Sequence, residues 1–138
     1  MSGRVGSNID PVEKLLAEVV DSFEKLELLL RLYDDPSITH TMETIASQFS
    51  LPEEVTRDAL SALSATGVVR SDDRGWQFDG SSPWASEVKD LAQLYETDRH
   101  AILKRLTELA LARMRSRTAR RFANAFMLRP RKPGDPDG

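Results

Sequence analysis

Hydrophobic residues recur at helical spacing along most of the chain, and short segments rich in Asp, Ser, Pro and Gly separate the periodic stretches. The first stretch has apolar side chains three or four positions apart from residue 12 to residue 33, which predicts an amphipathic helix. Asp10–Pro11 supplies its start signal. Because Asp21–Ser22 can cap a second helix, a break near residue 21 stays open.

Two shorter helices are predicted next. Residues 41–49 have one apolar face and follow Thr41, a good N-cap residue. Ser50 with Glu53 forms the pattern of a capping box, which predicts that a third helix opens at Ser50. Gly67 is a typical helix stop, so this third helix ends there.

A β-hairpin is predicted directly after the third helix. Val68–Val69–Arg70 and Trp76–Gln77–Phe78 are short segments rich in β-branched and aromatic residues, and Asp72–Asp73–Arg74–Gly75 between them has the composition of a turn. The predicted order is therefore helix, short helix, tight turn, capped helix and two-stranded hairpin.

A long helical pattern follows the hairpin. Ser81–Ser82–Pro83 gives a start signal, and no Gly or Pro interrupts residues 84–129, a length that requires a bend or a packing partner. Four of its apolar residues recur every seven positions and form a possible two-stranded seam: Val88, Tyr95, Ile102 and Leu109. A second chain could pack along this seam, and the alternative is that all four residues belong to the core of a single chain.

These patterns divide the chain into four segments. A polar N-terminus and a Pro/Gly-rich tail, both expected to be disordered, flank a body and a helical extension. The segments are residues 1–9, the body 10–82, the extension 83–128 and the tail 129–138.

The charged residues distinguish the body from the extension, because the net charge of −3 is unevenly distributed along the chain. Residues 1–98 contain 8 Lys and Arg against 19 Asp and Glu, whereas residues 99–132 contain 11 against 1. Such opposite blocks indicate an acidic body and a basic extension that meets an anionic partner or an acidic protein surface.

The basic charge is densest in RMRSRTARRF, residues 113–122. On a helix, Arg113, Arg117 and Arg120 share one stripe, and Met114 and Phe122 fall roughly opposite. Three interpretations remain: contact with nucleic-acid phosphates, pairing with an acidic surface of the same or another protein, or binding to an anionic membrane. The membrane is the least favoured, because the segment offers few aromatic anchors.

Two parts of the chain resemble known proteins. METIASQFSLPEEVTRDALSALSATGVVR followed by DDRGWQF resembles the winged helix-turn-helix superfamily of bacterial transcriptional regulators. SPWASEVKDLAQLYETDRHAIL and RRFANAFMLRPRK resemble the second half of small bacterial winged-helix proteins. The resemblance implies a mainly α winged helix-turn-helix fold with a short β-hairpin wing and a long C-terminal helical extension, whose third helix enters the DNA major groove.

This resemblance assigns candidate DNA-contacting residues to the third helix, the wing and the extension. They are Arg57, Ser61, Arg70, Arg74, Arg113, Arg117, Arg120 and Arg121. The acids Glu53 and Glu54 at the start of the third helix weaken attraction to phosphate, although they can simply favour the helix dipole. Asp72 and Asp73 leave the alternative that the wing is a solvated turn.

Signals of catalysis are absent from the sequence. There is no cysteine, the two histidines lie 60 positions apart, and no Gly-rich phosphate loop or nucleophile elbow occurs. We therefore expect no enzyme activity, metal or cofactor. Without a signal peptide or a long apolar run, the expected location is the cytoplasm.

The sequence thus predicts a homodimeric, DNA-binding protein similar to transcriptional regulators. The alternative is a winged-helix interaction module with little DNA affinity that docks an acidic protein partner through its arginine-rich segment.

Overall fold

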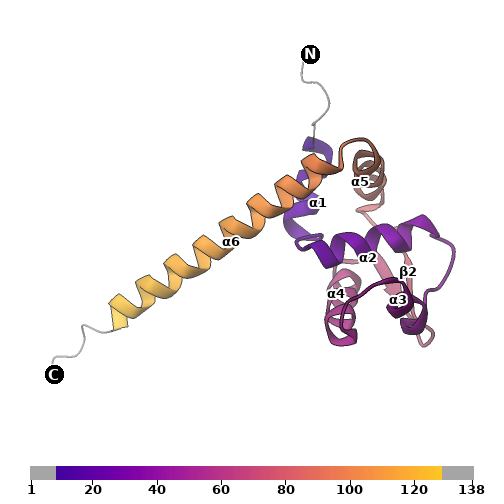
Figure 1. Cartoon of the computed structure of the whole chain (residues 1–138), viewed down its shortest axis with the longest axis horizontal. Helices are drawn as coiled ribbons and strands as arrows, with labels where there is room; N and C mark the ends of the chain where they lie inside the picture. Colours follow the sequence, from indigo (N-terminus) through magenta and orange to yellow (C-terminus); the bar gives the residue numbers. More distant parts are fainter. Residues whose placement is uncertain (1–8, 129–138) are drawn as a thin grey trace, which may run out of the picture. The chain divides into compact units, whose positions relative to one another are not determined.

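A computed structural model describes residues 9–128, with side chains as far as residue 123 (Figure 1). The segments expected to be disordered lie outside the described residues, apart from Ile9. The expectation of a mainly α fold is confirmed, because the described residues form six helices and one two-stranded antiparallel sheet. The elements are α1 (Asp10–Glu18), α2 (Phe23–Asp34), α3 (Met42–Gln48), α4 (Glu53–Thr66), β1 (Val69–Ser71), β2 (Trp76–Phe78), α5 (Ala85–Thr97) and α6 (Arg99–Leu128).

The first periodic stretch divides into two helices, so the break near residue 21 is confirmed. Helix α1 ends at Glu18, and the Ser22 hydroxyl accepts a 3.2 Å hydrogen bond from the backbone N–H of Lys25 at the start of α2. An N-cap bond of this kind satisfies a backbone donor that the helix itself leaves without a partner.

The short helix α3 begins where the sequence predicts, because the Thr41 hydroxyl accepts a 3.1 Å hydrogen bond from Thr44 N–H. Helix α4 begins at Glu53 rather than at Ser50, so the predicted capping box does not form. Pro52 explains the later start: a residue that precedes proline is disfavoured in the α conformation, which keeps Leu51 out of a helix.

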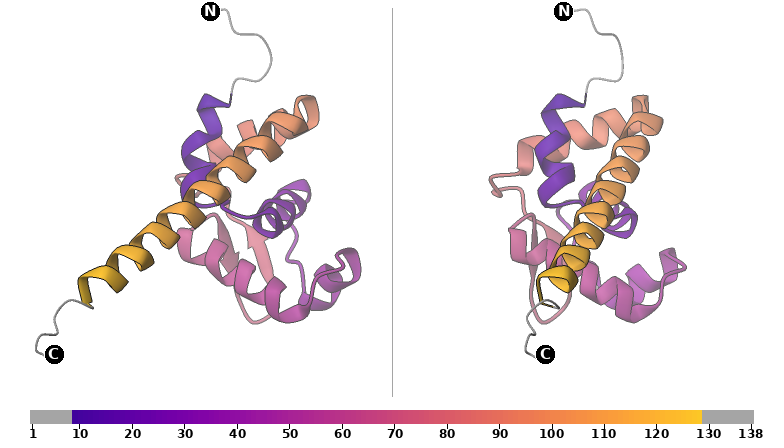
Figure 2. Two further views of the ribbon diagram at one scale, coloured as in Figure 1. Left: turned by 60° about the vertical axis from the view of Figure 1, so that its left-hand side comes forward. Right: turned by 90° about the vertical axis from the view of Figure 1, so that its left-hand side faces the viewer.

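The hydrophobic core lies among α1, α2, α4 and α5 and under the hairpin. Helix α1 packs against α5, α2 packs against α4 and β2, and α4 contacts α3 and β1 (Figures 1 and 2). The largest fully buried side chains are Leu15, Leu16, Leu26, Leu28, Leu29, Leu32, Ile45, Leu60, Leu63, Leu91, Ile102 and Leu106.

The hairpin is confirmed and has an additional attachment. Val69 pairs with Phe78 and Ser71 with Trp76, around the predicted turn. His40 also pairs with Trp76 through two backbone hydrogen bonds, 2.7 Å from His40 N–H and 2.9 Å from Trp76 N–H. This bridge fixes β2 to the segment between α2 and α3.

The long helical pattern over residues 84–129, whose length called for a bend or a packing partner, is interrupted at Asp98. Asp98 ends α5 in a non-helical conformation, and its carboxylate accepts a 3.3 Å hydrogen bond from Ala101 N–H in the first turn of α6. Aspartate is one of the strongest N-cap residues, so it separates two helices without any Gly or Pro.

The chain divides into two compact units after Leu106, whereas the sequence placed the boundary after residue 82. We call residues 9–106 the body and residues 107–128 the arm. Helix α5 belongs to the body because it packs against α1, and the first two turns of α6 belong there as well.

The predicted dimer seam does not form a continuous surface. Val88 and Ile102 are 0% exposed inside the body, Tyr95 is half-buried there, and Leu109 belongs to the arm. The break at Asp98 also changes the helical phase between Tyr95 and Ile102. Val88 and Ile102 therefore act as core residues and are not accessible to a second chain.

An ion pair ties the start of α6 to α1. Arg105 Nε and Nη2 donate hydrogen bonds of 2.9 and 2.7 Å to the two carboxylate oxygens of Glu13. These bonds hold the pKa of Glu13 below its ordinary value of 4.5. A bidentate pair of this kind is stronger than a single contact.

The Glu13–Arg105 pair predicts a specific pH dependence of stability. Because the folded-state pKa of Glu13 is lowered, its contribution is present above pH 4.5 and is lost as the pH falls through the folded pKa. Glu13→Gln should lower the free energy of unfolding by about 0.5–1 kcal/mol near neutral pH, and the difference from the parent should shrink in acid. Urea titrations from neutral to acidic pH, with Glu18→Gln as a control on the exposed side of α1, test this. A difference that does not change with pH would contradict it.

Candidate nucleic-acid interface

The exposed side of α4 carries the residues that the sequence assigned to base reading. Arg57 and Ser61 are exposed there, together with Glu53 and Glu54. The Arg57 guanidinium forms an ion pair with the Glu53 carboxylate one turn earlier. The only cation of α4 is therefore engaged by an acid of the same helix, and the exposed face of α4 is acidic overall.

The hairpin places Arg70 on β1 and Arg74 in the turn, both exposed. Asp72 accepts hydrogen bonds of 2.7 Å from Arg74 N–H and 3.1 Å from Gly75 N–H. These backbone bonds, together with the nearby positive charges of Arg74 and Arg70, lower the pKa of Asp72. Asp72 is thus a turn-forming residue, and its carboxylate offsets part of the positive charge of the hairpin.

The arm exposes most of its arginines. Arg115, Arg117, Arg120 and Arg121 are exposed and Arg113 is half-buried. Since residues of an α-helix are about 100° apart around its axis, a basic stripe is formed by four of them, Arg113, Arg117, Arg120 and Arg121.

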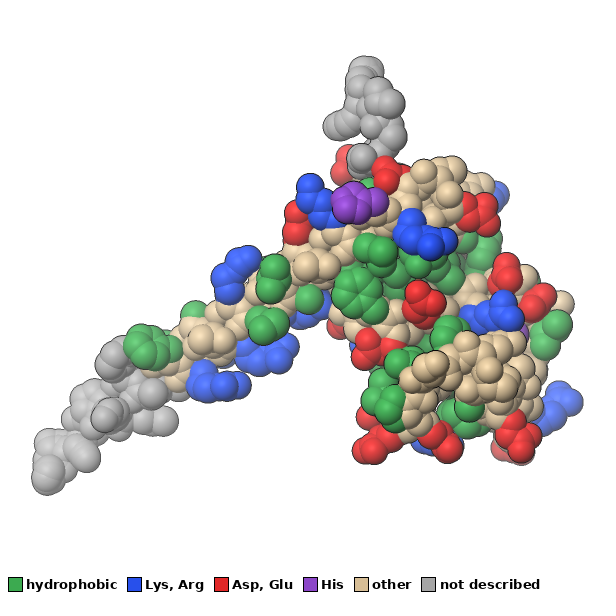
Figure 3. All heavy atoms as spheres, viewed as in Figure 1, with side chains coloured by type: hydrophobic (Ala, Val, Ile, Leu, Met, Phe, Trp, Pro, Cys, Tyr) green, Lys and Arg blue, Asp and Glu red, His purple; other side chains and the backbone are tan. Residues whose placement is uncertain are grey.

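Large apolar side chains of the arm are exposed as well. Leu111, Met114 and Phe122 are 46%, 57% and 62% exposed. They follow the basic stripe by roughly a third of a turn, and Arg115 lies on their other side. We call Leu111, Met114 and Phe122 the apolar stripe; Figure 3 shows hydrophobic side chains among the basic ones along α6.

Positive charge is therefore concentrated in the arm. Residues 9–106 contain 10 Lys and Arg against 19 Asp and Glu, whereas residues 107–123 contain 5 against 1. Of the eight candidate contact residues, the four on α4 and the hairpin belong to the acidic body, and the four of the basic stripe belong to the arm.

The sequence did not reveal a groove in the body. Its volume is about 670 Å³, and residues of α2, the end of α3 and α5 line it: Glu27, Leu30, Arg31, Tyr33, Asp34, Gln48, Phe49, Ala92, Tyr95 and Glu96. Three of these are carboxylates and one is a cation. We call this cavity the acidic groove.

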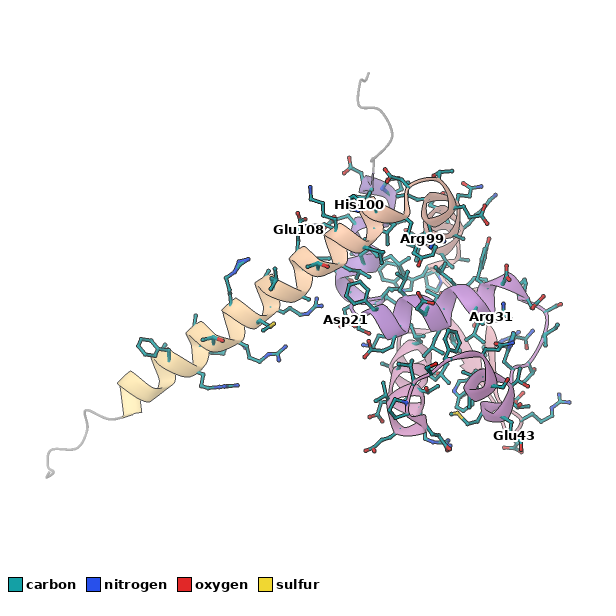
Figure 4. The ribbon with its side chains drawn as sticks, in the orientation of Figure 1. Asp21, Arg31, Glu43, Arg99, His100 and Glu108 are labelled. Atoms are coloured by element: carbon teal, nitrogen blue, oxygen red, sulfur yellow. The ribbon has the colours of Figure 1, made fainter. Side chains whose placement is uncertain are left out.

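Polar contacts organise the acidic groove. The Tyr95 hydroxyl donates a 3.4 Å hydrogen bond to Glu27, and burial together with the Glu27 charge raises the pKa of Tyr95. The Arg99 guanidinium lies 4.8 Å from the centre of the Tyr95 ring, a cation–π contact. Arg31 donates a 2.9 Å hydrogen bond to Gln48 at the end of α3 (Arg31 and Arg99 are labelled in Figure 4).

Within residues 9–128, no helix is long and apolar enough to cross a membrane. Over the same described residues, no group of three or more His, Asp or Glu side chains is arranged to hold a metal ion.

Comparison with known proteins gives no relative: no protein-family model, no curated protein and no solved structure matches this chain.

Proposed function

We propose that the chain is a cytoplasmic, non-catalytic DNA-binding protein of the winged helix-turn-helix type, similar to transcriptional regulators. The order α2, α3, tight turn, α4 and β-hairpin supports this fold. The bridge between His40 and Trp76 supports the assignment of the hairpin as a wing, because it attaches β2 to the helical body while residues 72–74 of the turn stay exposed.

The observation that carries DNA binding is the exposed basic stripe. Its arginines stand on a segment with a single acid, Glu108, and guanidinium groups bind phosphate oxygens with two parallel hydrogen bonds. The exposed face of α4 contributes little to phosphate attraction, because Glu53 engages Arg57 and Glu54 adds a further negative charge. In this proposal the arm supplies most of the affinity, while α4 and the wing supply contacts to bases and a few phosphates.

Removing arm arginines should weaken DNA binding and reduce its dependence on salt. The triple variant Arg117→Ala, Arg120→Ala and Arg121→Ala loses three phosphate contacts, so the slope of log K against log salt should fall by about 2.7. Affinity for a random duplex in low salt should fall at least about tenfold. Fluorescence anisotropy with a labelled duplex at about 50 and about 200 mM salt measures both quantities.

A matched control removes the same charge from the body. Lys14, Lys89 and Lys104 are exposed there, and their replacement by Ala should leave the slope near that of the parent. Undetectable binding by the parent in low salt would refute the proposal. An equal loss in the two triple variants would show that net charge, rather than the arm, sets the affinity.

One observation favours a second candidate function, that of a protein-interaction module. Leu111 and Met114 expose about half of their surface beside the basic stripe, and contact with phosphate makes no use of such apolar side chains. An arm that docks an acidic protein surface would bury them.

A further inference from the structure

The arm has no hydrophobic core of its own. Among residues 107–123, whose side chains are described, none is buried, and the apolar stripe is exposed to solvent. Exposed apolar residues gathered on one side of a helix are a common mark of a docking surface, because covering them removes apolar area from water.

The arginines around the apolar stripe determine the chemistry of its partner. Arg115 lies on one side of the stripe, and Arg117 and Arg121 lie on the other. Two such arms packed side by side along this stripe would bring like charges together, which disfavours pairing of arm with arm. A suitable partner surface has an apolar centre and a negatively charged rim.

The acidic groove of the body has these properties. Leu30, Phe49 and the rings of Tyr33 and Tyr95 supply apolar and aromatic surface, and carboxylates surround it: Glu27, Asp34 and Glu96. Its lining cation, Arg31, is engaged by Asp34 and Gln48, and Arg99 lies beside the groove over the Tyr95 ring. Three carboxylates against these two cations leave a net negative charge next to aromatic faces.

The groove also already holds a guanidinium against one of its rings. Arg99 lies over Tyr95 at 4.8 Å, while Glu27 accepts a hydrogen bond from the hydroxyl of that tyrosine. An arginine flanked by apolar side chains can repeat this combination of ring stacking and charge pairing at Tyr33 or Phe49. The groove is open to solvent, and its volume of about 670 Å³ can accommodate several side chains.

We propose that the arm of one copy of this chain binds in the acidic groove of a second copy. Each copy carries both surfaces, with opposite charge, so two copies can exchange arms reciprocally and form the same contact twice. This interface replaces the seam predicted from the sequence, and it uses exposed residues instead of the buried Val88 and Ile102.

The proposal goes beyond DNA binding and makes the two uses of the arm mutually exclusive. The same arginines would pair with groove carboxylates in the absence of DNA and with phosphates in its presence. Duplex DNA should therefore convert the self-associated form into DNA-bound single copies, a step that rests on the proposed function. Self-association itself does not depend on the proposed DNA binding.

Sedimentation velocity of the full chain tests the interface. The parent should self-associate at about 50 mM salt and become monomeric at about 500 mM, since screening weakens pairs of exposed charges. Glu27→Gln with Glu96→Gln should weaken self-association at least about tenfold in low salt, and Leu111→Ser with Met114→Ser should do the same. All four side chains are exposed and none belongs to the buried core, so the variants should fold.

A charge-matched control distinguishes the groove from net charge. Glu18→Gln with Glu43→Gln changes the charge equally on exposed positions outside the groove and should leave self-association unchanged. A monomeric parent in low salt would overturn the proposal, as would equal weakening by the groove pair and the control pair. A failure of DNA binding would be seen separately by anisotropy and would leave this result standing.

Discussion

Ile102→Ala is expected to lower the free energy of unfolding of the body by about 3 kcal/mol, the typical cost of removing a large apolar side chain from a packed core. Ile102 is 0% exposed, and it lies in the first turn of α6, where that helix still belongs to the body. Its removal leaves a cavity that the surrounding helices fill only in part. Urea denaturation followed by circular dichroism measures the change.

Leu111→Ala is the matched control on the same helix. Leu111 is 46% exposed in the arm, so the same kind of truncation should change the free energy of unfolding by no more than about 0.5 kcal/mol. The comparison also distinguishes a core role of Ile102 from a role in the predicted dimer seam. A seam residue would leave the unfolding of a single chain unchanged and would alter only the sedimentation mass, and that outcome would contradict its assignment to the core.

The helices and strands of the body could largely be predicted from the sequence because their boundaries carry strong local signals. Gly67 adopts φ +89°, a left-handed conformation that glycine reaches without strain, and it ends α4 as expected. Thr41 caps α3, and β2 has the predicted bounds. Such signals act within one turn of chain, so the sequence displays them directly.

The position of the break at Asp98 does not follow from Gly and Pro, because a capping acid inside a continuous hydrophobic pattern separates the two helices. Thr97–Asp98 carried the signal: the Thr97 hydroxyl donates to the carbonyl oxygen of Gln93, and Asp98 caps α6. Without this boundary, α5 and α6 form one continuous pattern with a seven-residue repeat that includes the buried Val88 and Ile102.

The sequence predicts which residues of the candidate site are exposed, but it does not predict which side chains they contact. Exposure of Arg57, Ser61 and the wing arginines follows from helical and strand periodicity. The ion pair of Arg57 with Glu53 depends on side-chain conformation, and the acidic groove is assembled from three segments far apart in the sequence. Tyr95 illustrates the limit: its position in a repeat suggested a seam, whereas packing places its hydroxyl near Glu27.

The distribution of charge has a mechanistic consequence for the proposed function. An acidic body repels duplex phosphates, so the arm must outweigh this repulsion before α4 or the wing can approach bases. Specificity and affinity would then be carried by different parts of the chain. A regulator of this kind would bind DNA strongly only when its arm is free.

Gly75→Ala is expected to lower the free energy of unfolding by about 3 kcal/mol and to detach the β1–β2 hairpin from the segment that contains His40. Gly75 adopts φ +155°, which residues with a side chain rarely adopt, and a Cβ at this position would clash with the backbone carbonyl of His40. Relief of the clash requires movement of the two backbone hydrogen bonds that join His40 to Trp76. The substitution therefore combines backbone strain with loss of the bridge that holds β2.

Two other glycines provide a graded control for this effect. Gly67→Ala imposes only the strain of φ +89°, about 1 kcal/mol, because no atom lies within 4 Å of the added Cβ. Gly80→Ala meets neither a close atom nor a positive φ and should stay within about 0.5 kcal/mol of the parent. Urea denaturation of the three variants, followed by tryptophan fluorescence, should rank them in this order. Equal losses at Gly75 and Gly67 would show that the close approach of His40 does not constrain the hairpin.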